Sequence, residues 1–161
     1  MKSMNRLMLL ACLVLPFAAC KKEEEVQVER APVAAPTTDD KTEWNAYLQD
    51  QVPRHMEGIT TNPFIYRVPA ETNPDDPEEF NRLQEKAQQD VARGIVKGNM
   101  LAYAGRDPAR TADLVVSAFA DVPPGSMNGV RVLYIGDAAN SERVKAAVEP
   151  AGVEYVFVQA R

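Results

Sequence analysis

The sequence contains few of the residues that build catalytic and metal sites. Its 161 residues include a single histidine, His55, and two cysteines, Cys12 and Cys20. One histidine and two thiols cannot supply a His/Cys metal cluster of the usual kind. The serines lack a G-x-S-x-G nucleophile elbow, and neither a Walker loop nor a G-x-G-x-x-G motif is present. We therefore expect no metal and no cofactor, and we do not expect an enzyme.

Long apolar runs and basic clusters are missing as well. The apolar run from Leu7 to Leu15 is shorter than the roughly 20 residues that a membrane-spanning helix needs, and no longer run follows it. The formal net charge is −5 at pH 7, and the Lys and Arg residues form no stripe that could follow a phosphate backbone. Nucleic acid is therefore not an expected partner.

The first 20 residues carry the most specific signal in the chain. Lys2 and Arg6 precede the apolar run, which is the order found in secretory signal peptides. The sequence Leu15-Pro16-Phe17-Ala18-Ala19-Cys20 resembles the lipobox of bacterial lipoproteins, although Phe17 stands where that family usually has Leu. The resemblance implies that the signal peptide, residues 1–19, is removed and that Cys20 becomes a lipidated first residue bearing fatty acids such as palmitate. An ordinary cleaved signal peptide, which would leave Cys20 free, is the alternative.

The residue after the cysteine bears on location. Lys21 follows Cys20, whereas in the lipoprotein family an Asp at this position favours retention in the inner membrane. The resemblance therefore implies an outer-membrane lipoprotein whose domain lies in the periplasm. Several buried acyl chains suffice for stable attachment. Because Cys12 would leave with the signal peptide and Cys20 would carry lipid, the mature domain would have no thiol for redox chemistry.

The remainder divides into a tether and a domain. Residues 20–40 contain many charges and prolines 32 and 36, so they hold too little apolar surface to offset the entropy of ordering. We predict a lipidated cysteine and a flexible, disordered tether over this range. Residues 41–161 are numerous enough for one core, and they show no internal repeat.

The pattern within 41–161 predicts a small single α/β domain with a mostly parallel sheet of about four strands and flanking helices. Val130–Ile135 and Val153–Val158 are nearly continuous apolar runs, which are typical of strands covered on both faces. Met100–Ala104 is a third predicted strand, and Phe64–Val68 is a fourth, at an edge because prolines flank it. Helices are predicted from Trp44 to Val52, from an Asp76 cap to Gly98, from Asp107 to Ala120, and from Asn140 or Ser141 to Glu149.

Ligands of parallel sheets usually bind beyond the carboxyl ends of the strands. The polar residues expected there are Arg67, Arg106, Asp107, Asp137, Asn140 and Ser141, close to helix amino termini that can hold an anion. Most have a simpler structural explanation, because Asp107 and either Asn140 or Ser141 are suited to capping helices. Asp137 has no evident role beyond forming a turn, so it is the residue of greatest interest.

The segment from Ser141 to Val148, followed by Gly152-Val153, resembles part of the OmpA-like peptidoglycan-binding domains. In that family an Asp before the helix and an Arg within it hold the diaminopimelate of the wall peptide. The resemblance makes Asp137 and Arg143 the matching candidates. The family has a much longer interval between the two residues, however, and its preceding loop is missing here.

Two functions remain, with an enzyme as a third. The first is binding of another envelope protein, as an assembly subunit, inhibitor or immunity factor, with Trp44 and Tyr66 as candidate anchors of the interface. The second is binding of peptidoglycan or a small ligand at the strand-end loops, through Arg106, Asp107, Asp137, Asn140, Ser141 and Arg143. A tethered acidic domain without catalytic groups favours the first.

Overall fold

The computed structural model describes residues 31–70 and 72–160. The predictions for the signal peptide, for lipid on Cys20 and for residues 20–30 of the tether lie outside the described residues. From Ala31 onward the chain forms one compact unit. No helix among the described residues has both the length and the apolar character needed to cross a bilayer.

The centre of this unit is a parallel sheet of four strands. The strands are β1 (Phe64–Val68), β2 (Met100–Gly105), β3 (Arg131–Gly136) and β4 (Glu154–Gln159). They lie in the order β1-β2-β3-β4, and every neighbouring pair is parallel. The predicted α/β class, the sheet of about four parallel strands and the edge position of the first strand are confirmed.

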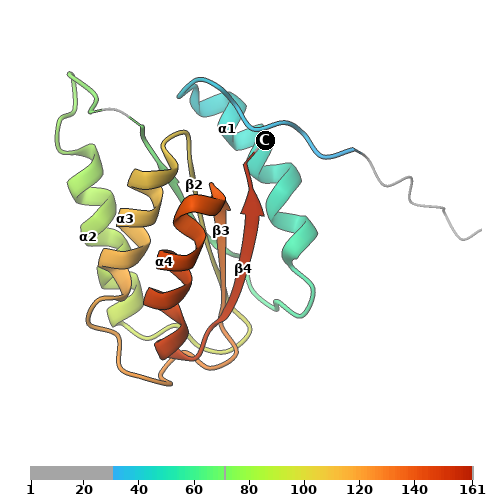
Figure 1. Ribbon diagram of the computed structural model, residues 1–161, viewed down its shortest axis with the longest axis vertical. Helices are drawn as coiled ribbons and strands as arrows, with labels where there is room; N and C mark the ends of the chain where they lie inside the picture. The colour runs from blue at the N-terminus through green and yellow to red at the C-terminus, as the bar shows by residue number, and fades with distance from the viewer. Residues whose placement is uncertain (1–30, 71, 161) are drawn as a thin grey trace, which may run out of the picture. The chain divides into compact units, whose positions relative to one another are not determined.

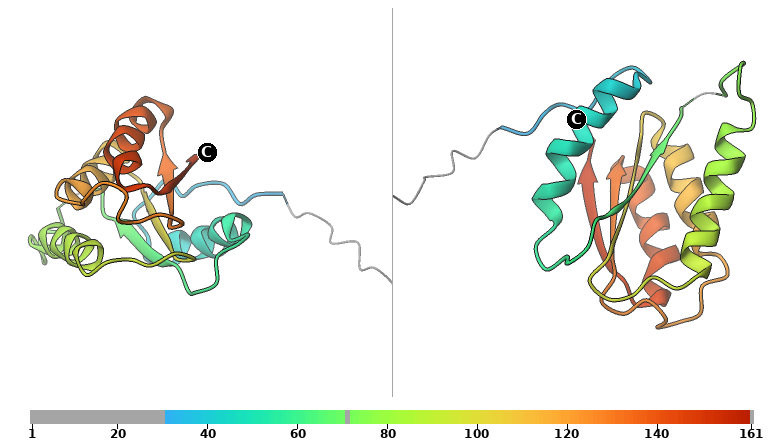
Figure 2. Two further views of the ribbon diagram at one scale, coloured as in Figure 1. Left: turned by 90° about the horizontal axis from the view of Figure 1, so that it is seen from below. Right: turned by 180° about the vertical axis from the view of Figure 1, so that it is seen from behind.

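Helices cover the two faces of the sheet unequally. α2 (Glu79–Ala92), α3 (Pro108–Phe119) and α4 (Ala138–Val148) connect successive strands and lie together on one face (Figures 1 and 2). Each crossover advances the sheet by one strand in the same direction, and right-handed crossovers of this kind place their helices on the same side. Of the described helices, α1 (Lys41–Gln51) lies alone on the other face, where it continues into the short 3-10 helix η1 (Val52–His55).

The sheet separates two apolar clusters. Leu101 and Tyr103 of β2 pack beneath α2, α3 and α4, whereas Met100, Ala102 and Ala104 pack against Trp44 and the rest of α1. Because side chains alternate along a strand, a central strand buried on both faces is apolar at almost every position. This arrangement explains the continuous apolar runs in the sequence.

Two helices do not begin at the caps that the sequence suggested. Asp76 does not cap α2; it lies in a turn and pairs with Arg82, while Glu78 precedes the helix without a side-chain cap. α2 also ends earlier than Gly98, because Gly94 adopts a φ of +85° and turns the chain. α4 begins at Ala138 with Asp137 as its cap, so Asn140 and Ser141 lie inside the helix.

Residues 31–40 form no helix or strand, yet they contact the domain. The Val33 amide donates to Asp50 at 3.0 Å, and the Ala70 amide donates to Asp39 at 2.9 Å. The indole of Trp44 donates to the carbonyl of Thr38 at 2.8 Å. In Figure 1 this blue segment passes the carboxyl ends of the strands before α1 begins. The predicted boundary at Lys41 is therefore too late, because residues 33–39 already belong to the folded unit.

Candidate functional site

The carboxyl ends of β2, β3 and β4 form a cavity of about 390 Å³. Arg106 and Asp137 both line it, together with Gly105, Gly136 and Gln159, and residues 35–37 close one side. The sheet therefore brings together two of the predicted strand-end residues. Its strand order never reverses, however, so the sheet has no switch point of the type that opens a crevice in doubly wound folds.

The two aspartates at this end act as helix caps. Asp107 accepts hydrogen bonds from the amides of Ala109 at 2.9 Å and Arg110 at 3.0 Å. Asp137 accepts from the amide of Ala139 at 2.8 Å. The neighbouring Ala138 amide is satisfied by Gln159 Oε1 at 3.2 Å. Since these amides already have acceptors, the helix amino termini offer an external anion little, and Asp137 has the structural role that the sequence did not reveal.

The remaining candidates of this set are engaged elsewhere. Ser141 is buried and shares a hydrogen bond with the Tyr155 hydroxyl at 3.0 Å. Arg143 links α4 to α3 through Asp113 at 2.6 Å and the Ala109 carbonyl at 2.8 Å. Asn140 accepts from Arg143 at 3.0 Å instead of capping the helix. Asp137 is thus bonded to the first turn of α4, whereas Arg143 is bonded to α3.

Trp44 and Tyr66, predicted as interface anchors, are core residues instead. Each is only 1% exposed. Trp44 packs edge-on against Tyr47 beneath α1, and Tyr66 donates its hydroxyl proton to Asp90 at 2.9 Å. Burial, together with the acceptor Asp90, raises the pKa of Tyr66 above its ordinary value. The prediction that these two residues anchor an interface is therefore wrong.

An exposed apolar surface does lie beside them. Ile65, the residue before Tyr66, is 46% exposed, and its side chain lines a groove of about 480 Å³ between α1 and β1. The floor of this β1 groove includes the core residues Leu48 and Val52. The other lining residues are Asn45, Gln49, Pro53, Met56, Pro63 and Arg67.

The β1 groove has two further properties. β1 pairs only with β2 among the described strands, so its outer backbone edge has no strand partner there. Arg67 is the only one of the described lining residues with a formal charge. Its Nη2 lies 3.9 Å from Glu79 Oε1, and its buried Nη1 has no hydrogen-bond acceptor among the described residues. The groove is thus an apolar channel with one incompletely paired cation.

Sequence reasoning missed this site for a specific reason. Because side chains alternate along the strand Phe64–Val68, Ile65 and Arg67 lie on one face of the sheet, and Tyr66 and Val68 lie on the other. The alternation does not reveal which of these two faces helices cover. Whether Ile65 is covered depends on how much of its face of the sheet the single helix α1 can reach.

Among the described residues no group of three or more His, Cys, Asp or Glu side chains is placed to hold a metal ion.

Searches against protein-family models, curated proteins and solved structures found no match for the chain.

Proposed function

We propose that this protein is an outer-membrane lipoprotein, anchored through lipid on Cys20, whose periplasmic domain binds another envelope protein at the β1 groove. The observation that carries the binding site is the exposure of Ile65 on a sheet edge beside a groove with a core-residue floor. The lipobox resemblance supports the anchor and the location.

The groove offers apolar burial and backbone pairing together. Removal of apolar surface from water contributes about 25 cal/mol per Å². A segment in extended conformation can fill the groove with alternate side chains while its backbone pairs with β1, a mode used by many peptide-binding domains. Pro63 and Pro69 flank the strand, and proline cannot donate a backbone hydrogen bond. They limit such pairing to a short segment.

The charge of the groove selects among possible segments. Arg67 contributes the sole formal charge within the described part of the lining, and its pairing with Glu79 is long at 3.9 Å. A carboxylate delivered by the partner would complete the coordination of the guanidinium, which binds carboxylates in a two-pronged geometry. The partner segment we propose is therefore extended, mainly aliphatic, and bears one acidic residue.

Paired variants test this surface. In the full lipidated chain, Ile65→Asp should lower capture of the envelope partner by at least about ten-fold, because it places a carboxylate in the apolar channel. Val96→Asp is the matched control, since Val96 is 70% exposed and lies outside the groove. Circular dichroism and thermal unfolding establish that both variants are folded. Equal capture by Ile65→Asp, Val96→Asp and the unaltered protein would overturn the proposal.

The alternative function, binding of peptidoglycan or a small ligand at the strand-end loops, is supported by the 390 Å³ cavity that Arg106 and Asp137 line. It predicts cosedimentation of the protein with purified cell wall. It also predicts that Arg106→Ala reduces this binding while Ile65→Asp does not. That pair of results would replace the first proposal by the second.

A further inference from the structure

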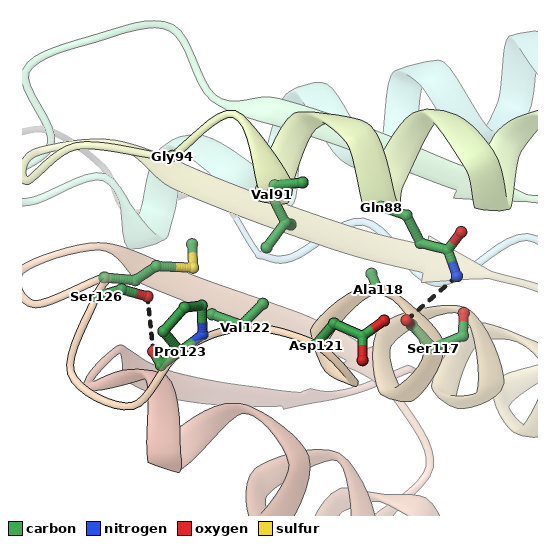
Figure 3. Close-up of a pocket in the computed structure, with 11 residues that line it drawn as sticks. Gln88, Val91, Gly94, Ser117, Ala118, Asp121, Val122, Pro123 and Ser126 are labelled. Carbon is green, nitrogen blue, oxygen red and sulfur yellow. Dashed lines mark hydrogen bonds between the residues drawn. The ribbon is translucent and has the colours of Figure 1, made fainter.

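A second groove lies on the opposite face of the sheet, where α2 and α3 end. Its volume is about 490 Å³. Figure 3 shows Gln88 and Val91 of α2 on one side, with Asp121, Val122 and Pro123, from the segment after α3, on the other. We call it the α2–α3 groove. It shares no lining residue with the β1 groove.

The groove reaches the core because α2 and α3 both end before they cover the core residues beneath it. Gly94, with a φ of +85°, turns the chain away after α2, and Pro123 follows the end of α3 in the facing segment. The floor between them consists of Val91, Ala118 and Met127, which are 4%, 5% and 2% exposed. A ligand in this groove would therefore contact core side chains, and its volume falls within the usual range for small-molecule sites.

Three polar side chains around this apolar floor donate hydrogen bonds to backbone carbonyls. The hydroxyl of Ser126 donates to the Pro123 carbonyl at 2.7 Å, and the hydroxyl of Ser117 donates to the Leu114 carbonyl at 2.9 Å. Gln88 donates its side-chain amide to the Ser117 carbonyl at 3.3 Å, as Figure 3 shows. Both hydroxyl donors and one of the two N–H donors of Gln88 are thus already bonded to the protein.

Backbone donors of the same segment are committed as well. The amides of Val122, Ser126 and Met127 donate to the carbonyls of Phe119, Pro123 and Ala151 at 3.2, 3.2 and 2.8 Å. Among the described residues that line the groove, Asp121 alone has a formal charge, and its carboxylate has no hydrogen bond or ion pair with any of them or with the rest of the described chain. A ligand that carries donors and a positive charge would therefore be complementary to Asp121.

We propose that the α2–α3 groove binds a small organic cation, an ammonium or guanidinium group attached to an apolar body. The apolar body lies over Val91, Ala118 and Met127, and the cation donates to the Asp121 carboxylate. This site is independent of the proposed protein-binding function, because it uses a different face of the sheet.

Three probes of equal length test the proposal on the full chain. They are n-hexylammonium, n-hexanol and hexanoate, and binding is followed by the methyl NMR signals of Val91, Val122 and Met127. We expect saturable shifts with n-hexylammonium, at least ten-fold weaker binding of n-hexanol, and no binding of hexanoate. Similar affinity for all three probes, or shifts confined to other residues, would overturn the proposal.

Removal of the charge on Asp121 is the second test of the proposed cation site. Asp121→Asn should weaken n-hexylammonium at least about ten-fold and leave n-hexanol unchanged. Asp121 is exposed, so this variant is expected to fold. Glu142→Gln removes another exposed carboxylate, which lies outside the groove on α4, and should change neither affinity. If Asp121→Asn and Glu142→Gln bind n-hexylammonium equally well, the assigned role of Asp121 is wrong.

Discussion

Tyr66 of β1 stacks on Tyr103 of β2, with ring centroids 4.7 Å apart and planes inclined by 12°. The two residues are register partners in adjacent parallel strands, and both lie beneath α2 and α3. Their hydroxyl groups differ in one respect. Tyr66 donates to Asp90, whereas the fully buried hydroxyl of Tyr103 has no hydrogen-bond partner among the described residues. Burial raises the pKa of Tyr103 well above its ordinary value, so this hydroxyl stays protonated.

The difference predicts opposite effects of the same substitution. Tyr103→Phe should raise the free energy of unfolding by about 1 kcal/mol, because it removes a buried polar group without a partner. Tyr66→Phe should lower it by about 1–2 kcal/mol, because Asp90 loses a hydrogen bond. Urea denaturation of the two variants measures both effects. A loss of stability in Tyr103→Phe would mean that its hydroxyl has a partner in solution.

The helix caps predict stability effects at the strand ends. Asp107→Ala should lower the free energy of unfolding by about 1 kcal/mol, because two amides of α3 lose their acceptor. Asp137→Ala should cost about as much or slightly less, since it caps one amide of α4. Asp107→Asn and Asp137→Asn are the controls, because Asn also caps well. Equal losses in the Asn and Ala variants would indicate that charge, and not capping, is what these residues contribute.

His55 predicts a pH dependence of stability. Burial lowers its pKa below the ordinary 6.5, and the nearby cations Arg131 and Arg54 lower it further. The unfolded state therefore binds the proton more readily, so the contribution of His55 is fully present above about pH 6.5 and is lost as the pH falls below it. The free energy of unfolding should decrease from pH 7 to pH 5, and His55→Gln should flatten that decrease. An unchanged slope in the variant would contradict the assignment.

Much of the fold could be predicted from the sequence. The apolar runs Val130–Ile135 and Val153–Val158 each fall within one residue of an observed strand, because burial on both faces requires continuous apolar character. The order of strands and helices could also be predicted, because strand patterns and helix patterns alternate along the sequence. Helix starts were harder. Asp76 and Asp137 both precede helical segments, and only the three-dimensional path decides that Asp137 caps while Asp76 pairs with Arg82.

The candidate sites could not be predicted in the same way. Aromatic residues such as Trp44 and Tyr66 favour both interfaces and cores, so their type alone did not separate the two environments. Exposure of Ile65 results from the unequal number of helices on the two faces, which is a property of the complete topology. The α2–α3 groove likewise depends on where two helices end relative to each other.

The contacts of residues 33–39 predict local protection from exchange. Asp39→Ala removes the acceptor of the Ala70 amide, so that amide should exchange faster, and the Val33 amide should follow as the segment detaches. Hydrogen exchange followed by NMR measures both. Asp75→Ala, at an exposed turn, is the control and should leave both amides unchanged. Exchange within seconds at Val33 and Ala70 in the unaltered protein would restore the flexible tether up to residue 40.

The proposed anchor predicts the behaviour of one variant in the cell. Cys20→Ala removes the acceptor of the lipid, so the protein should leave the membrane fraction or remain unprocessed, and it should lose palmitate labelling. The measurement is membrane fractionation with radiolabelled palmitate. Labelling that persists in Cys20→Ala would show that the lipobox interpretation is wrong.

The most direct test of protein binding at the β1 groove is a crosslink formed there in the native envelope. A photoreactive p-benzoylphenylalanine replaces Ile65 in the full lipidated chain, and in a second strain it replaces Val96, which is also exposed but lies outside the groove. The proposal predicts one specific adduct with another envelope protein from position 65, none from position 96, and loss of the adduct when Arg67→Glu is added. Identical adducts from both positions, or none from position 65, would contradict it.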